Sequence, residues 1–185
     1  MDDNNQIEQI RNSLGLVHIY CGDGKGKTTA AAGLAIRAKG RGLNVLFVQF
    51  LKKSNSGELD SLRELGVEVV SGQPYGKFVF RMDDSEKVET RAFNQQRLKD
   101  VIERSREGID LLIFDEILVA ITLDMVDEQD VLAFLDSKPE HLEVVLTGRG
   151  PSDAMLDIAD YVSEVVMRKH PYETSGLIAR QGIEF

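Results

Sequence analysis

A glycine- and lysine-rich segment at residues 21–29 has the composition of a loop that binds phosphate. Glycine lets consecutive backbone amides turn toward phosphate oxygens without a side-chain clash. Lys27 would supply a positive charge, and the Thr28 hydroxyl can ligate magnesium. The usual pattern starts with glycine five residues before Gly26, where this chain has Cys21 instead. The segment predicts ATP or another polyphosphate bound by Gly22, Asp23, Gly24, Lys25, Gly26, Lys27, Thr28 and Thr29.

Two adjacent carboxylates, Asp115 and Glu116, follow the apolar run at residues 111–114. In proteins with a phosphate loop, an acid at a strand end meets the metal ion held by the loop hydroxyl, and we expect its strand beside the first strand. The alternative is a helix N-cap, because Asp favours that position and Glu suits a first turn. Together with the loop, the pair favours a site for Mg²⁺ or Mn²⁺ formed by Thr28, Asp115 and Glu116.

Two further polar side chains lie at expected strand ends. Arg149 stands between two glycines after the apolar run at residues 144–147, where it could reach a phosphate, although a solvated loop charge is the alternative. Gln49 ends another apolar run, and a hydrogen bond that closes a turn explains it equally well.

The elements that must position these residues alternate along the chain. Continuous apolar runs separated by helix-like segments predict a doubly wound α/β domain with a mainly parallel sheet, in the three-layer, RecA-like architecture of P-loop NTPases. The expected strands are 16–20, 45–50, 67–70, 111–114, 144–147 and 161–167. The expected helices are 27–39, 57–65, 85–106, 128–136 and 152–159.

The remaining segments divide the chain into an arm and one domain. Residues 1–15 are expected to form a mobile or loosely docked N-terminal arm, and residues 16–185 a single domain. Residues 71–84 form the longest stretch without periodicity, and long loops of this kind are commonly functional.

The charge balance excludes several functional classes. The chain carries 22 basic and 31 acidic side chains, a net charge of −9, which argues against nonspecific nucleic-acid binding. No apolar run is close to the length of about 20 residues that a membrane-spanning helix needs. With Cys21 as the single cysteine, no internal disulfide can form, and a reducing cytoplasm is the expected location.

The phosphate-loop sequence at residues 22–31 resembles that of the ATP:corrinoid adenosyltransferases of the cobalamin pathway, which usually have Asn where this chain has Asp23. The similarity extends in order over nearly the whole chain. Beyond the loop it includes Arg37, residues 48–50, 57–58, 115–116 and 147–150, and the tail at 169–170 and 182–183.

This resemblance implies an unusual use of the phosphate loop. Cobalt(I) of a reduced corrinoid would attack the 5′-carbon of ATP and release triphosphate, so the protein needs no nucleophile of its own. Lys27, Thr28 and Glu116 would be the catalytic residues, and Arg37 and Arg149 would join the loop in binding ATP.

The resemblance also gives the loop at residues 71–84 a role. Family members carry an aromatic pair, often Phe-Thr-Trp, that packs under the corrin ring; Phe78 matches its first member, whereas Phe80 stands where Trp is commoner. An apolar ring is retained, although ordinary core packing of both rings is the alternative.

As partners, the resemblance implies a reduced corrinoid, a flavin-type reductase that supplies electrons, and a second copy of the chain in a homodimer. From the residues alone, an ATP-binding regulatory protein and a P-loop ATPase or kinase remain open.

Overall fold

The computed structural model describes residues 3–185 and contains a six-stranded sheet in which every neighbouring pair is parallel. The strand order is β3-β2-β4-β5-β1-β6. The strands are β1 (Val17–Cys21), β2 (Val45–Gln49), β3 (Glu68–Val70), β4 (Leu111–Asp115), β5 (Glu143–Thr147) and β6 (Tyr161–Glu164). The predicted α/β class and parallel sheet are confirmed.

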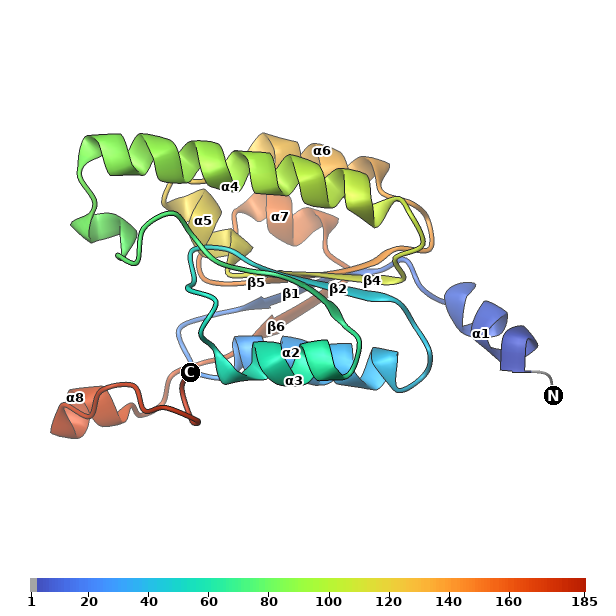
Figure 1. Ribbon diagram of the computed structural model, residues 1–185, viewed down its shortest axis with the longest axis horizontal. Coiled ribbons are helices and arrows are strands. Elements are labelled where there is room, and N and C mark those ends of the chain that lie inside the picture. The colour runs from blue at the N-terminus through green and yellow to red at the C-terminus, as the bar shows by residue number, and fades with distance from the viewer. Residues whose placement is uncertain (1–2) are drawn as a thin grey trace.

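Helices cover both faces of this sheet, as Figure 1 shows. One face carries α2 (Lys27–Lys39) and α3 (Gly57–Glu64); the other carries α4 (Asp84–Ser105), α5 (Ile117–Thr122), α6 (Glu128–Ser137) and α7 (Asp153–Ile158). Alternation along β4 explains the two hydrophobic cores: Leu112 and Phe114 join one, and Leu111 and Ile113 join the other. Such strands read as continuous apolar runs because both faces are buried.

The structure gives detail on both termini. Helix α1 (Asp3–Arg11) forms within the predicted N-terminal arm, and it contacts the domain: Ile7 and Ile10 pack against the core beneath α2 and α3, and Arg11 Nε donates to Asp110 Oδ1 at 2.8 Å. The chain after β6 leaves the sheet at residue 164 rather than 167, forms a short helix, α8 (Pro171–Ser175), and continues as a tail to Phe185.

The loop predicted at residues 71–84 contains one 3₁₀ turn, η1 (Val79–Arg81), and ends in a capped helix. The Asp83 carboxylate accepts from the Glu86 backbone N–H at 2.9 Å, and the Glu86 carboxylate accepts from the Asp83 N–H at 3.1 Å. This reciprocal cap fixes where α4 begins, and thereby where the preceding loop is held. No helix among residues 3–185 is long and apolar enough to cross a membrane.

Candidate active site

The predicted phosphate loop connects β1 to α2 and passes close to the chain that follows β6. The Gly24 N–H donates to Val165 O at 2.7 Å. A Cβ atom at Gly24 would lie 2.7 Å from that oxygen, and one at Gly22, which has a φ of 99°, would lie 2.6 Å from it. Glycine is therefore required at both positions by the close backbone approach, in addition to any ligand.

The ammonium group of Lys27 lies within this loop. Its Nζ donates to the carbonyl oxygens of Gly22 at 2.6 Å and Gly24 at 2.8 Å. Burial lowers the pKa of Lys27, and the Glu116 carboxylate partly offsets that effect. The side chain is thus placed to meet an anion cradled by the loop amides.

A buried carboxylate, Asp115, joins the start of α2 to the ends of three strands. Its Oδ1 accepts from the Thr28 hydroxyl at 2.9 Å and from the Thr147 hydroxyl at 2.8 Å. Its Oδ2 accepts from Gln49 Nε2 at 3.1 Å and from Lys52 Nζ at 2.7 Å. The structure thus brings the Thr28 hydroxyl of the loop and the Asp115 carboxylate at the strand end into contact, as predicted.

The way the two groups meet differs from the expectation. The strand that carries Asp115, β4, is not beside β1, because β5 lies between them. Thr147 at the end of β5 fills this gap, since its hydroxyl bonds both Asp115 and the Glu116 N–H, the latter at 2.9 Å. No role was predicted for Thr147, although its position at the end of an apolar run was a signal for one.

Glu116 adopts the left-handed conformation, with a φ of 64° and a ψ of 18°, immediately before α5. Non-glycine residues held in this region store strain and cluster at functional sites. Burial raises the pKa of Glu116, and Asp115 adds to the effect, while Lys52 and Lys27 oppose it. Its carboxyl group is therefore costly to ionise in the protein alone.

The two predicted arginines are placed differently. Arg149 Nε lies 3.7 Å from Asp23 Oδ1, so it reaches the rim of the phosphate loop, and both side chains are exposed. Arg37 lies in the last turn of α2, ten residues after Lys27. At a rise of about 1.5 Å per residue, its backbone lies about 15 Å along the helix from Lys27, so Arg37 starts farther from the loop amides than Arg149 does from the rim.

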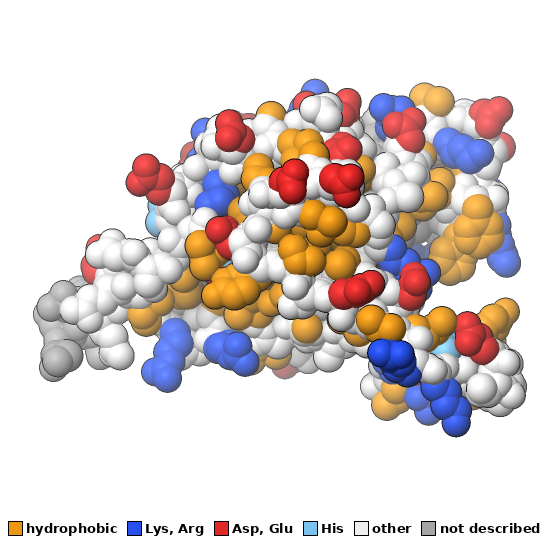
Figure 2. Space-filling model, turned by 180° about the vertical axis from the view of Figure 1, so that it is seen from behind, with side chains coloured by type: hydrophobic (Ala, Val, Ile, Leu, Met, Phe, Trp, Pro, Cys, Tyr) orange, Lys and Arg blue, Asp and Glu red, His pale blue; other side chains and the backbone are white. Residues whose placement is uncertain are grey.

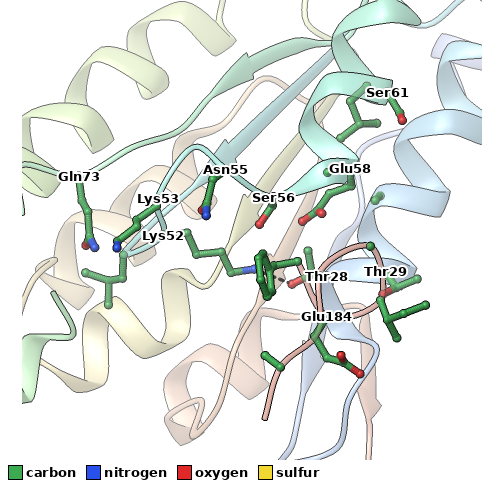
Figure 3. A pocket seen from close by; sticks show the side chains of 18 of the residues that line it. Thr28, Thr29, Lys52, Lys53, Asn55, Ser56, Glu58, Ser61, Gln73 and Glu184 are labelled. Carbon is green, nitrogen blue, oxygen red and sulfur yellow. Dashed lines mark hydrogen bonds between the residues drawn. The ribbon is translucent and has the colours of Figure 1, made fainter. Parts of the chain in front are cut away.

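A cavity of about 910 Å³ opens beside the loop and is shown in Figure 3. It is lined by Thr28 and Thr29, by Phe78 of the loop before α4, and by the C-terminal tail. The tail is held there by Glu184, whose Oε1 accepts from Lys25 Nζ at 2.8 Å. Arg180 bonds the same carboxylate and, with Lys25, lowers the pKa of Glu184.

The two predicted corrinoid-binding rings are not core residues. Phe78 and Phe80 are 67% and 75% exposed, and their rings stack with centroids 5.4 Å apart and planes 8° from parallel. An exposed stacked aromatic pair at a cavity mouth offers a flat apolar surface to a planar ligand.

The oxygen atoms at this site suit a hard divalent cation. Mg²⁺ prefers carboxylate and hydroxyl oxygens, which Thr28, Asp115 and Glu116 provide. In the part of the chain that the structure describes, there is no cluster of three or more His, Cys, Asp or Glu side chains that could hold a metal. Mg²⁺ in proteins commonly takes one or two carboxylates together with substrate phosphates and water.

Comparison with known proteins decides the family. The model of the family "ATP:corrinoid adenosyltransferase BtuR/CobO/CobP" matches residues 13–185. The chain belongs to this family. The adenosyltransferase resemblance predicted from the sequence is thereby confirmed.

Corrinoid adenosyltransferases of several bacteria match over most of their length. Corrinoid adenosyltransferase CobA of Salmonella typhimurium is 32% identical, over 97% of this chain and 90% of its own. The corrinoid adenosyltransferase of Sinorhizobium sp. is 34% identical, over 92% and 80%, and that of Pseudomonas aeruginosa 30%, over 97% and 88%. The chain is therefore an enzyme, a corrinoid adenosyltransferase of cobalamin adenosylation.

Proposed function

We propose that this adenosyltransferase joins the 5′-carbon of ATP to the cobalt(I) of a reduced corrinoid. The cobalt–carbon bond forms as the bond between the 5′-carbon and its oxygen breaks. The electron pair of the broken carbon–oxygen bond leaves with triphosphate. Cobalt(I) supplies both electrons of the new bond, so no protein nucleophile takes part. What the chain must supply is binding, orientation and stabilisation of the departing negative charge.

The phosphate loop carries this proposal. Gly22, Gly24 and Gly26 carry no side chains themselves, and Lys27 Nζ already makes two hydrogen bonds within the loop, at 2.6 and 2.8 Å. When a polyphosphate binds in the loop, the Lys27 ammonium group would donate to its oxygens instead of to the two carbonyl oxygens. Arg149 at the rim, and Lys25, Thr28 and Thr29, would bind the remaining phosphate oxygens.

A divalent cation would be held by Thr28, Asp115 and Glu116. When bound, it would supply Lewis-acid stabilisation of charge on the triphosphate. The chain's own contribution is to hold the oxygen ligands in place: Thr147 bonds to both Asp115 and the Glu116 N–H. The strained backbone and raised pKa of Glu116 agree with a carboxylate whose partner arrives with the substrate.

The corrinoid would lie against Phe78 and Phe80. Their exposure and stacking support this placement, as does the presence of Phe78 at the same cavity as Thr28. Two contacts, Lys77 with Glu86 and Tyr75 with Glu89, hold the preceding loop against α4. The rings are thereby presented on an anchored segment, which lowers the entropy lost when a ligand binds.

We also propose that the chain forms a homodimer through the edge of the sheet at β6. All four residues of β6 are exposed, Tyr161 and Val162 by 54% and 48%, and Val166 beyond the strand by 53%. Figure 2 shows hydrophobic side chains gathered across the middle of the face seen there. An exposed apolar edge strand invites pairing with a second copy.

The flavin-type reductase that would deliver the electrons stays a prediction of the family resemblance.

The test mixes the protein with Mg-ATP and chemically reduced cobalamin under anaerobic conditions. We expect a light-sensitive alkylcobalt absorption spectrum and an equal amount of triphosphate. ADP with phosphate, and no alkylcobalt product, would identify an ATPase and contradict the proposal. ATP binding without any turnover would favour the regulatory alternative.

A further inference from the structure

Lys52, in the loop that follows β2, lies at the centre of the proposed cation site. Its Nζ donates to Asp115 Oδ2 at 2.7 Å and to Thr28 Oγ1 at 2.9 Å. Figure 3 shows the side chain extending across the cavity to Thr28. The ammonium group thus bridges two of the three oxygen groups to which a divalent cation would bind.

Asp115 has no acceptor capacity left while Lys52 is bound. A carboxylate offers about four lone-pair positions, and Thr28, Thr147, Gln49 and Lys52 together donate four hydrogen bonds to it. Direct binding of a cation to Asp115 therefore requires one of these donors to leave.

Three of the donors are held by regular structure. Thr147 and Gln49 are fully buried at the ends of β5 and β2, and Thr28 lies in the first turn of α2. Lys52 alone of the four comes from a loop, and its side chain is 25% exposed. Its departure would also free the Thr28 oxygen, which accepts the second hydrogen bond from the same ammonium group.

We propose that Lys52 is a further substrate-binding residue that exchanges partners during nucleotide binding. In the free protein its ammonium group neutralises Asp115 at the cation site; with Mg-ATP it leaves Asp115 and Thr28 and binds a phosphate oxygen. The side chain can make this change without backbone movement, because four flexible carbons separate its charge from the chain and the loop of Thr28 is already in contact. The inference rests on the proposed use of this site for ATP.

The proposed exchange predicts that removal of Lys52 changes the affinities for divalent cation and for ATP in opposite directions. Without Lys52, free protein should bind a divalent cation more tightly, because nothing competes for Asp115 and Thr28. The same protein should bind ATP more weakly, because one phosphate partner is missing. Removal of a purely structural counter-ion of Asp115 would also tighten cation binding but would not weaken ATP binding, so the two opposite effects together identify the exchange.

The experiment titrates nucleotide-free protein with Mn²⁺, following the free-ion signal by electron paramagnetic resonance, and measures Mg-ATP binding by calorimetry. For Lys52→Met we expect about tenfold tighter Mn²⁺ binding and about tenfold weaker ATP binding. Lys52→Arg retains a cation and should leave Mn²⁺ affinity near that of the original protein. The control is Lys53→Met, which removes an exposed charge that makes no hydrogen bond to Thr28 or Asp115 among residues 3–185 and should alter Mn²⁺ affinity little.

Circular dichroism establishes that each variant is folded before its affinities are compared. Unchanged or weaker Mn²⁺ binding by Lys52→Met would overturn the exchange, as would equal Mn²⁺ affinities for the Met and Arg variants or undiminished ATP binding. Failure of the proposed function is a different result, namely no adenosylated corrinoid from the original protein. The two failures are therefore distinguishable.

Discussion

Replacement of Thr147 by valine tests how much the hydroxyl bridge between Asp115 and Glu116 contributes to the site. Valine has nearly the shape of threonine, so the fully buried position stays filled. What disappears is a donor to the Asp115 carboxylate at 2.8 Å and an acceptor for the Glu116 N–H at 2.9 Å. The variant thus removes two hydrogen bonds and leaves the packing in place.

The loss can be estimated from these two contacts. A hydrogen bond to a charged group contributes about 1.5–3 kcal/mol, and an orphaned buried N–H costs about 1–3 kcal/mol. Because such contributions are not additive when groups are neighbours, we expect a fall of about 3 kcal/mol in the free energy of unfolding. For a domain of this size the melting temperature should fall by about 6–12 °C.

Urea and thermal denaturation of Thr147→Val measure this loss, and the rate of adenosyl transfer measures its effect on the acid pair. Thr147→Ser is the matched control: it keeps both hydrogen bonds and loses one methyl group, for about 1 kcal/mol. If the valine variant loses less than the serine variant, or transfers the adenosyl group at an unchanged rate, the bridge does not organise this site.

Three other substitutions test separate parts of the site. Lys27→Ala should lower the rate of adenosyl transfer at least about 100-fold, measured by the alkylcobalt spectrum, because it removes a charge aimed at the departing triphosphate; a near-normal rate would contradict its role. Phe80→Ala should slow transfer to complete cobalamin about tenfold and leave ATP affinity unchanged by calorimetry, because it removes half of the exposed aromatic surface; an equal rate would count against the aromatic pair. Glu116→Gln should raise the free energy of unfolding at pH 7, because burial raises the pKa of Glu116 in the folded protein. Ionisation of the buried carboxyl group therefore destabilises the fold above that pKa, and this destabilisation disappears below about pH 4. Urea denaturation at both pH values checks this, and a gain that persists at low pH would have another cause.

Much of the fold was predictable because its signals are local. The apolar runs that became β2, β4 and β5 are continuous, and glycine marks the turn between β1 and α2. The strand order was not predictable in the same way. The predicted neighbour of β1 was the strand carrying Asp115, and nothing local to residues 111–116 reveals that β5 intervenes.

The site was likewise predictable only where its signals are local in sequence. The phosphate loop and the carboxylate pair have recognisable spacing, and their meeting follows once both lie at the carboxyl edge of one sheet. Lys52 has no such spacing: its contact with Asp115 joins residues 63 positions apart in sequence. Arg37 was predicted from its match to the family's sequence, which carries no information on distance, and in the structure it lies ten residues after Lys27 in α2.

The charges at the phosphate loop explain how a protein of net charge −9 can serve a polyanionic substrate. Four cations there are already engaged: Lys25 with Glu184, Lys52 with Asp115, Arg149 with Asp23, and Lys27 with loop carbonyls. A triphosphate that binds them must exchange with these partners, which lowers the net gain from each contact. Two of these partners can withdraw readily, since Asp23 is exposed and Glu184 belongs to the C-terminal tail that lines the cavity. With ATP bound as proposed, its affinity would depend on how easily these carboxylates leave, and the same carboxylates would cover the cations again once triphosphate has gone.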